Sequence, residues 1–341
     1  MNFNYLAKPW EILKKKNFFN LFCMTTPEDL TKNQKLPLYL ILVAWFVIVI
    51  ITTMRHEYWR DEIRALSLVL DSGSWIQLST HIKNEGHPIL WYALIKASLP
   101  IFGSSLTLPI LSIGIATCAI LIFLFKSPFP ILLKALFTFS ILPAYEYSVM
   151  SRNYGISMLL MFIYASLYKD RKKNLFYLCL ALALLANTNF PSLIAAALLT
   201  IILIWDTLIE SRDDNRGVSG GVIFGLLGLV LIAGIFSLIT IKPDNRSLLT
   251  TANHIKPISE YLVSVRAAFL HLESNLIHLF PETSGLTKRL LPQLFVWLSV
   301  AGLIKHKRLA LCLFFYFLSF GFLQHYAYPM ALRHEGIGFY S

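Results

Sequence analysis

The sequence predicts an all-α protein, a bundle of helices that cross a membrane several times, and three observations predict it. Of the 341 residues, 56% are hydrophobic and 14% are charged, whereas a soluble domain has about 25% charged residues. Apolar runs near the ~20 residues that a helix needs to cross a bilayer recur along the chain. The runs are continuous and do not alternate, which indicates helices and not the strands of a β-barrel.

The basic residues are placed like topology signals. The formal net charge is +11, but most lysines and arginines lie in short segments between the apolar runs, as the positive-inside rule requires. We therefore expect no nucleic-acid partner. The four cysteines have no spacing that suggests a metal site or a disulfide framework.

The expected elements follow in chain order. Residues 1–35 form a basic cytoplasmic segment, and the apolar segments cover about 36–54, 88–102, 106–125, 129–148, 153–168, 174–190, 191–209, 218–241, 291–304 and 309–328. Basic loops after 168, 209 and 304 lie inside. Parity then requires that one early segment does not cross, and we choose 88–102, which is short and carries Lys96 and Pro100.

Nine spans result, with long outer loops at 55–105 and 242–290. Residues 36–241 form the main transmembrane module, and interfacial helices lie within its outer first loop. Residues 291–341 form the C-terminal transmembrane helices. Because the chain stops just past a span, we expect a truncated C-terminal part.

An acidic pair, Asp61 and Glu62, opens the first outer loop in the stretch EYWRDEIR. Carboxylates are favourable at any helix N-terminus, and Asp61 also has Arg64 three residues ahead as an ion-pair partner. The flanking aromatics and the apolar helix that follows favour a second interpretation. We expect the reduced dielectric at such a boundary to affect the basicity of a carboxylate, which makes these residues candidates for a general base.

Other polar groups are expected on the same outer side. His87, in EGHP, is either a helix cap or a ligand-facing imidazole. Arg152, in MSRNYG, lies where an arginine is costly without a partner, and that partner is either Glu146 or a phosphate group. Asn189 either adds an amide to this rim or only forms hydrogen bonds with backbone groups at a break between two helices. Arg333 follows near the chain end.

The order of these features resembles the GT-C superfamily of membrane glycosyltransferases, which use a sugar carried on a polyprenyl phosphate. The matching elements are RDE at 60–62, GHPILWY at 86–92 and SRNYG at 151–155. The last is similar to the Arg-x-Tyr element of bacterial relatives such as the O-mannosyltransferases and aminoarabinose transferases. The resemblance covers roughly residues 36–210. Many relatives have a second proline where Ile89 stands, and most continue with further spans or a soluble outer domain.

The resemblance implies a GT-C fold and an inverting displacement at the outer membrane face. Asp61 would be the general base, with Glu62 and His87 as further catalytic residues that position hydroxyls. Arg152 would stabilise the leaving phosphate. Tyr154, Asn189 and Arg333 are the other expected substrate-binding residues. No cofactor is expected, although some members use a divalent ion, and no metal site is evident.

The expected partners are a polyprenyl-phosphate-linked sugar, membrane lipid and an acceptor that the sequence does not identify. The expected location is the bacterial inner membrane, with the site on the periplasmic or extracellular face. Two alternatives stay open: a non-catalytic homologue that assists envelope-glycan assembly, and a transporter of lipid-linked saccharides. A transporter is expected to have ionisable groups deep in its spans and two repeated halves, which the sequence lacks.

Overall fold

The computed structural model describes residues 32–83, 85–213, 220–241, 294, 297–303 and 305–326. Most of the expected N-terminal segment, the whole outer loop 242–290 and Arg333 lie outside the described residues. Within them the regular structure is helical, without strands, as the sequence predicts. The chain order is α2 Lys32–Met54, α3 Arg60–Leu70, α4 Trp75–His81, α5 Leu90–Lys126, α6 Ile131–Thr138, the π-helical turn η3 Leu142–Glu146, α7 Tyr154–Tyr168, α8 Arg171–Ala186, α9 Phe190–Asp213, α10 Gly220–Ile241 and α13 Lys307–Tyr326.

Four described helices are long and apolar enough to cross a membrane. These stretches are Lys35–Met54, Leu90–Lys126, Phe190–Thr207 and Gly220–Thr240. Large apolar side chains on their surfaces remain exposed, as expected of helices that face lipid. The apolar helices α7 and α8 have 15 and 16 residues. The expected membrane helices are therefore present in part, and the count of nine crossings stays a prediction.

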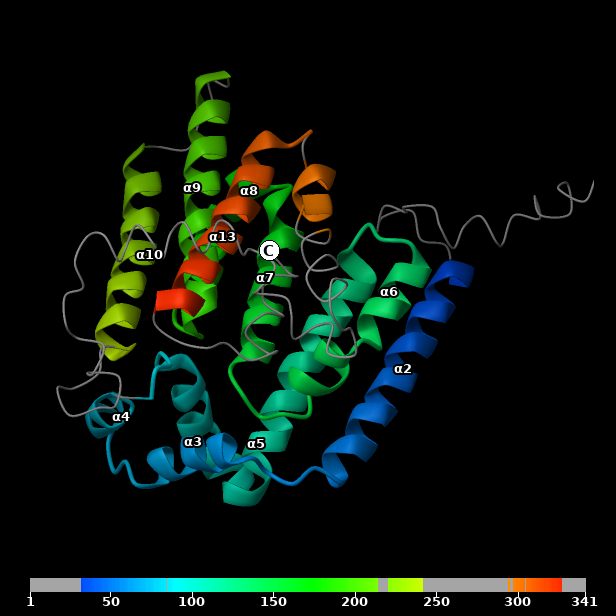
Figure 1. Ribbon diagram of the computed structural model, residues 1–341, viewed down its shortest axis with the longest axis vertical. Helices are drawn as coiled ribbons and strands as arrows, with labels where there is room; N and C mark the ends of the chain where they lie inside the picture. The colour runs from blue at the N-terminus through cyan, green and yellow to red at the C-terminus, as the bar shows by residue number, and fades with distance from the viewer. Residues whose placement is uncertain are drawn as a thin grey trace, which may run out of the picture.

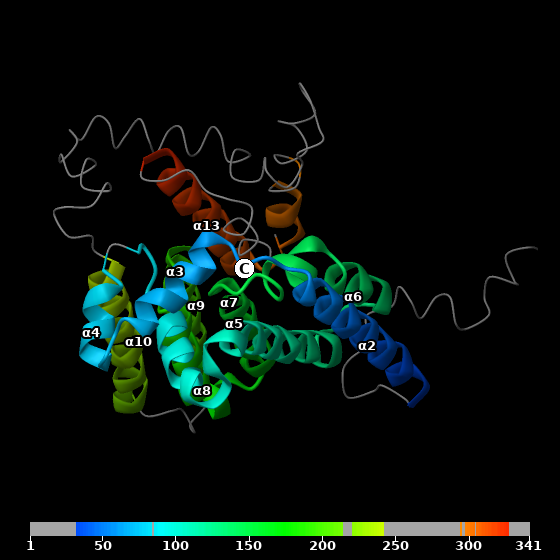
Figure 2. The same ribbon diagram turned by 90° about the horizontal axis from the view of Figure 1, so that it is seen from below.

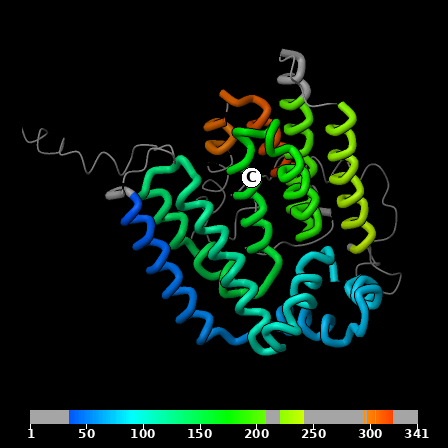
Figure 3. The backbone as a smooth tube through the Cα atoms, turned by 180° about the vertical axis from the view of Figure 1, so that it is seen from behind, coloured from blue at the N-terminus to red at the C-terminus, as the bar shows by residue number. Residues whose placement is uncertain are grey.

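The two segments expected at 88–102 and 106–125 meet at a sharp bend inside α5. Gly103 interrupts the helix with φ 70° and ψ 171°. Only glycine adopts this backbone conformation without strain, since it has no Cβ. The two parts of α5 can therefore take different directions, one toward the first-loop helices and the other along the bundle (Figure 3). Whether the first part lies at the membrane surface stays a prediction.

The expectation of one continuous helix over 129–148 is wrong. The chain forms the 8-residue α6, leaves helical geometry at Phe139, and then makes the π-helical turn η3. Pro143 explains the break, because proline lacks an N–H and its ring clashes with the carbonyl four residues earlier. The carbonyl of Pro143 accepts a hydrogen bond from the Trp45 indole at 3.2 Å, which ties α2 to η3. Hydropathy alone does not reveal such a break.

The helices form one bundle with the first-loop helices at one end (Figure 1). α5 packs against α7 and α2, α7 against α8, and α8 against α9 and α10. Seen from below, α3 and α4 lie across the end of the bundle (Figure 2). Buried Val69 and Ile82 from this loop share a core with Trp91 and Ile95 of α5. The first loop is therefore held in place by apolar packing, and α3 has a fixed position at this end of the bundle.

Candidate functional site

The acidic pair lies in the first turn of α3, next to the turn that precedes α7. Glu62 is wholly buried, whereas the Asp61 side chain is 33% exposed. Both carboxylates are favoured by the partial positive charge of the helix N-terminus. These two neighbours in sequence thus have different surroundings.

Glu62 is fully engaged by the protein. Its Oε2 accepts from the Trp59 backbone N–H at 2.7 Å and lies 2.9 Å from His56 Nε2. Its Oε1 accepts from the Ser151 backbone N–H at 2.6 Å. These three contacts connect the start of α3 to the turn that carries Arg152. This placement favours a positioning role for Glu62, and the expected contact with substrate hydroxyls stays a prediction.

Asp61, Arg152 and His87 meet in space although they come from three separate segments. Arg152 Nη1 lies 2.8 Å from Asp61 Oδ2, and Arg152 Nη2 lies 3.0 Å from His87 Nε2. The guanidinium only donates hydrogen bonds, so Nε2 accepts and the His87 ring proton is on Nδ1. The Arg152 side chain is 9% exposed. Asp61, and not the expected Glu146, forms this ion pair with Arg152. The expected phosphate partner stays a prediction.

The turn before α7 holds these groups through aromatic packing. Tyr154 is buried, stacks on Tyr147 with ring centroids 5.9 Å apart, and meets the edge of His87 at 6.5 Å. A Cβ added to Gly155 would lie 2.6 Å from the Tyr147 carbonyl oxygen. Only glycine permits this close approach. In SRNYG, therefore, the arginine reaches the site while the tyrosine and glycine shape the turn.

A second ion pair positions the segment that carries His87. Arg64 of α3 contacts Glu85 with both Nε and Nη2, at 2.6–2.9 Å. The hydrogen bond to Glu85, followed by the charge of that carboxylate, raises the pKa of Arg64. Gly86, with φ 70°, turns the chain between Glu85 and His87. The alternative pairing of Asp61 with Arg64 is thus replaced by two separate pairs.

Asn189 belongs to a different polar cluster. Its Nδ2 donates to Ser157 Oγ at 2.8 Å, and its Oδ1 accepts from the Ser192 N–H at 3.0 Å. All three residues are buried. The amide thus accepts a hydrogen bond from a backbone N–H in the first turn of α9 and ties α9 to α7. These contacts fit the structural role that was one of the two expected for Asn189. Its expected contact with substrate stays a prediction.

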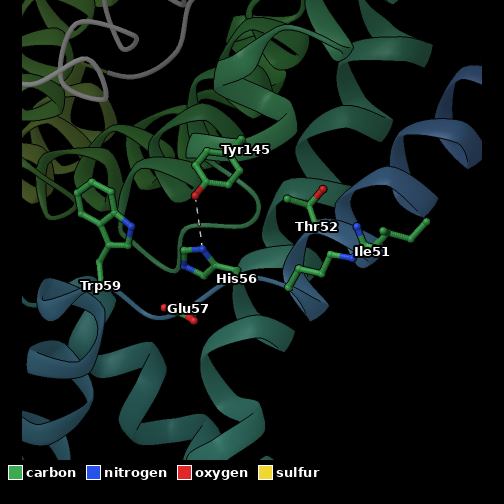
Figure 4. A pocket seen from close by; sticks show the side chains of 7 residues that line it. Ile51, Thr52, His56, Glu57, Trp59 and Tyr145 are labelled. Atoms are coloured by element: carbon green, nitrogen blue, oxygen red, sulfur yellow. Dashed lines mark hydrogen bonds between the residues drawn. The ribbon is translucent and has the colours of Figure 1, made fainter.

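His56 and Tyr145 are site residues that sequence reasoning missed. The His56 side chain is 4% exposed, contacts Glu62 with Nε2, and lies 3.5 Å from the Tyr145 hydroxyl with Nδ1. It faces an open pocket of about 500 Å³ lined by Ile51, Thr52, Arg55, His56, Glu57, Trp59 and Tyr145. Figure 4 shows the Tyr145 hydroxyl directed at the imidazole. No sequence motif marks either residue, although His56 directly precedes the acidic stretch.

The site combines an accessible carboxylate with a nearly buried cation. Asp61 can accept a proton, and Arg152 has further N–H donors beyond those directed at Asp61 and His87. Tyr58 lies between α2 and α3. Burial, followed by the charge of Glu62, raises the pKa of its hydroxyl. Within the described residues, no three His, Cys, Asp or Glu side chains gather as metal ligands.

Comparisons with models of known protein families, with curated protein sequences and with solved structures find no match to this chain.

Proposed function

We propose that the protein is an integral-membrane glycosyltransferase that moves a sugar from a polyprenyl-phosphate donor to an acceptor. The observation that carries the proposal is the cluster of Asp61, Arg152 and His87, with contacts of 2.8 and 3.0 Å. A base beside a phosphate-binding cation is what such a transfer requires. Four helices of membrane-spanning length support a lipid-linked donor.

Asp61 is the proposed general base. It would remove the proton from an acceptor hydroxyl or amine as that atom attacks the anomeric carbon. The new bond to the acceptor forms while the bond from carbon to the phosphate oxygen breaks, so the configuration inverts. The side chain is partly exposed, which leaves room for an acceptor, and proton transfer of this kind contributes about 10²–10⁴-fold in rate.

Arg152 is the proposed phosphate ligand. The leaving polyprenyl phosphate gains negative charge, and a guanidinium matches phosphate oxygens with paired N–H groups. Phosphate competes with Asp61 for these donors, so donor binding would loosen the ion pair and make the carboxylate available as a base. His87, which accepts from Arg152 at 3.0 Å, would hold the guanidinium in place meanwhile.

Binding and transfer with a polyprenyl-phosphate probe test the proposal in two steps. Purified wild-type protein should bind a polyprenyl phosphate, Arg152→Ala should bind it more weakly, and Asp61→Asn should bind it but fail in transfer. Equal binding by all three proteins would contradict the role of Arg152. No binding by the wild type would favour the non-catalytic homologue. Movement of the lipid-linked sugar from one leaflet of a vesicle membrane to the other, with the bond between sugar and phosphate intact, would indicate the transporter.

A further inference from the structure

An open pocket lies at the C-terminal end of α2 (Figure 4). We propose that this pocket binds a zwitterionic membrane lipid whose headgroup carries a phosphate and a primary ammonium. The inference uses the membrane location in the proposed function and does not depend on sugar transfer. Three features of the pocket support it: its charges, its aromatic rings and its connection to an apolar helix face.

The first feature is a pair of opposite charges. Arg55 and Glu57 both line the pocket and are both exposed. Within the described residues, neither side chain forms a hydrogen bond or an ion pair, whereas Arg64 and Arg152 are both paired. A guanidinium suits a phosphate, and a carboxylate accepts hydrogen bonds from an ammonium. Balanced charge favours a zwitterion over an anionic headgroup.

The second feature is the aromatic wall. Trp59 is 53% exposed and lines the pocket together with Tyr145. In Figure 4, Trp59 and Glu57 lie on one side of His56, with Thr52 and Ile51 on the other. An indole face attracts a cation, because its ring carries negative charge on its faces. Trp59 and Glu57 on the same side therefore suit the ammonium end of the headgroup.

The third feature is the route for the lipid tails. Ile51 lines the pocket and continues a stripe along α2 at helical spacing, formed by Val43, Val47, Ile51 and Met54, which are 59%, 48%, 48% and 82% exposed. α2 includes the candidate span Lys35–Met54. A headgroup in the pocket thus lies at the membrane edge, and its acyl chains can follow the stripe. A free sugar or phosphate would not use this apolar path.

Lipid retention tests the inference with full-length protein and no sugar donor. The protein is reconstituted in bilayers of equal amounts of phosphatidylethanolamine, phosphatidylcholine and phosphatidylglycerol, extracted, and analysed for retained lipid by native mass spectrometry. We expect the amount of retained phosphatidylethanolamine to exceed that of each other lipid by about tenfold, as a tenfold higher affinity would give. Arg55→Gln should reduce retention of both phosphatidylethanolamine and phosphatidylcholine, and Glu57→Gln should make these two lipids equal.

Arg60→Gln is the matched control. Arg60 is 94% exposed and lies outside the pocket lining, so this variant should retain lipid as the wild type does. Equal retention of the three lipids by the wild type overturns the inference, as does unchanged preference in both pocket variants. Displacement of phosphatidylethanolamine by polyprenyl phosphate would assign the pocket to the donor and also overturn it. The retention assay uses no sugar donor and measures no transfer. A protein that fails in sugar transfer can therefore still show the expected lipid preference.

Discussion

Arg152 Nη1 lies 2.8 Å from Asp61 Oδ2, although Asp61 begins α3 and Arg152 precedes α7. The pair is partly buried, with side-chain exposures of 33% for Asp61 and 9% for Arg152. Burial of an ion pair costs desolvation and does not by itself stabilise a fold. A binding site explains the pair better, because a ligand can replace one partner of the ion pair. Substitutions at four positions test this arrangement.

Asp61→Asn should slow sugar transfer strongly and leave the protein folded. The substitution preserves shape but removes the proton acceptor, so the transfer rate should fall by about 10²–10⁴-fold. The measurement is single-turnover transfer from a polyprenyl-phosphate sugar, with thermal unfolding in detergent as the folding control. Transfer at the wild-type rate would exclude Asp61 as the base.

Arg152→Lys should bind polyprenyl phosphate more weakly than the wild type, and Arg152→Ala should bind it more weakly still. Lysine keeps the charge but lacks the planar fork that engages two phosphate oxygens. A lost hydrogen bond to a charged group costs ~1.5–3 kcal/mol, or about 10–100-fold in affinity. Arg60→Ala is the control, since this arginine is 94% exposed and 3.8 Å from Asp61. An equal loss in the control would indicate a general charge effect.

Glu62→Gln should destabilise the fold more than Asp61→Asn does. The buried carboxylate accepts from the backbone N–H groups of Trp59 and Ser151, and an amide has only one oxygen to offer. A buried donor left unsatisfied costs ~1–3 kcal/mol. Thermal unfolding of both variants, at matched detergent concentration, measures the difference. Equal melting temperatures would show that the Glu62 contacts do not hold the Ser151 turn in place.

Gly155→Ala should disturb the turn before α7. The new Cβ would lie 2.6 Å from the Tyr147 carbonyl oxygen, which is backbone and does not move freely. We expect a loss of ~1–3 kcal/mol in stability, typical of overpacking, and weaker binding of polyprenyl phosphate. In the control Gly114→Ala, the added Cβ meets nothing within 4 Å, and alanine favours the helix by ~1 kcal/mol. Stability above wild type in Gly155→Ala would contradict the packing argument.

Part of this molecule could be predicted because hydropathy indicates which segments can form helices in a membrane. Long apolar runs predict helices such as α2 and α10, since every backbone polar group in a bilayer must be satisfied within the helix. The helix after the RDE stretch was also predictable, because its carboxylates and apolar face are local signals. The break at Pro143 was not recognised because the apolar run around it masked the local effect of proline.

The sequence by itself determined the helical class, the four long apolar helices and the position of Asp61 in the first turn of α3, because these follow from hydropathy and local charge. Only the tertiary structure decided the partners. Arg152 pairs with Asp61 and not with Glu146, Arg64 pairs with Glu85, and His56 reaches Glu62. The pairs of Arg152 and Arg64 join separate segments, whereas His56 and Glu62 are only six residues apart and meet at the start of α3. The choice of partner depends on how the helices pack, which no local pattern encodes.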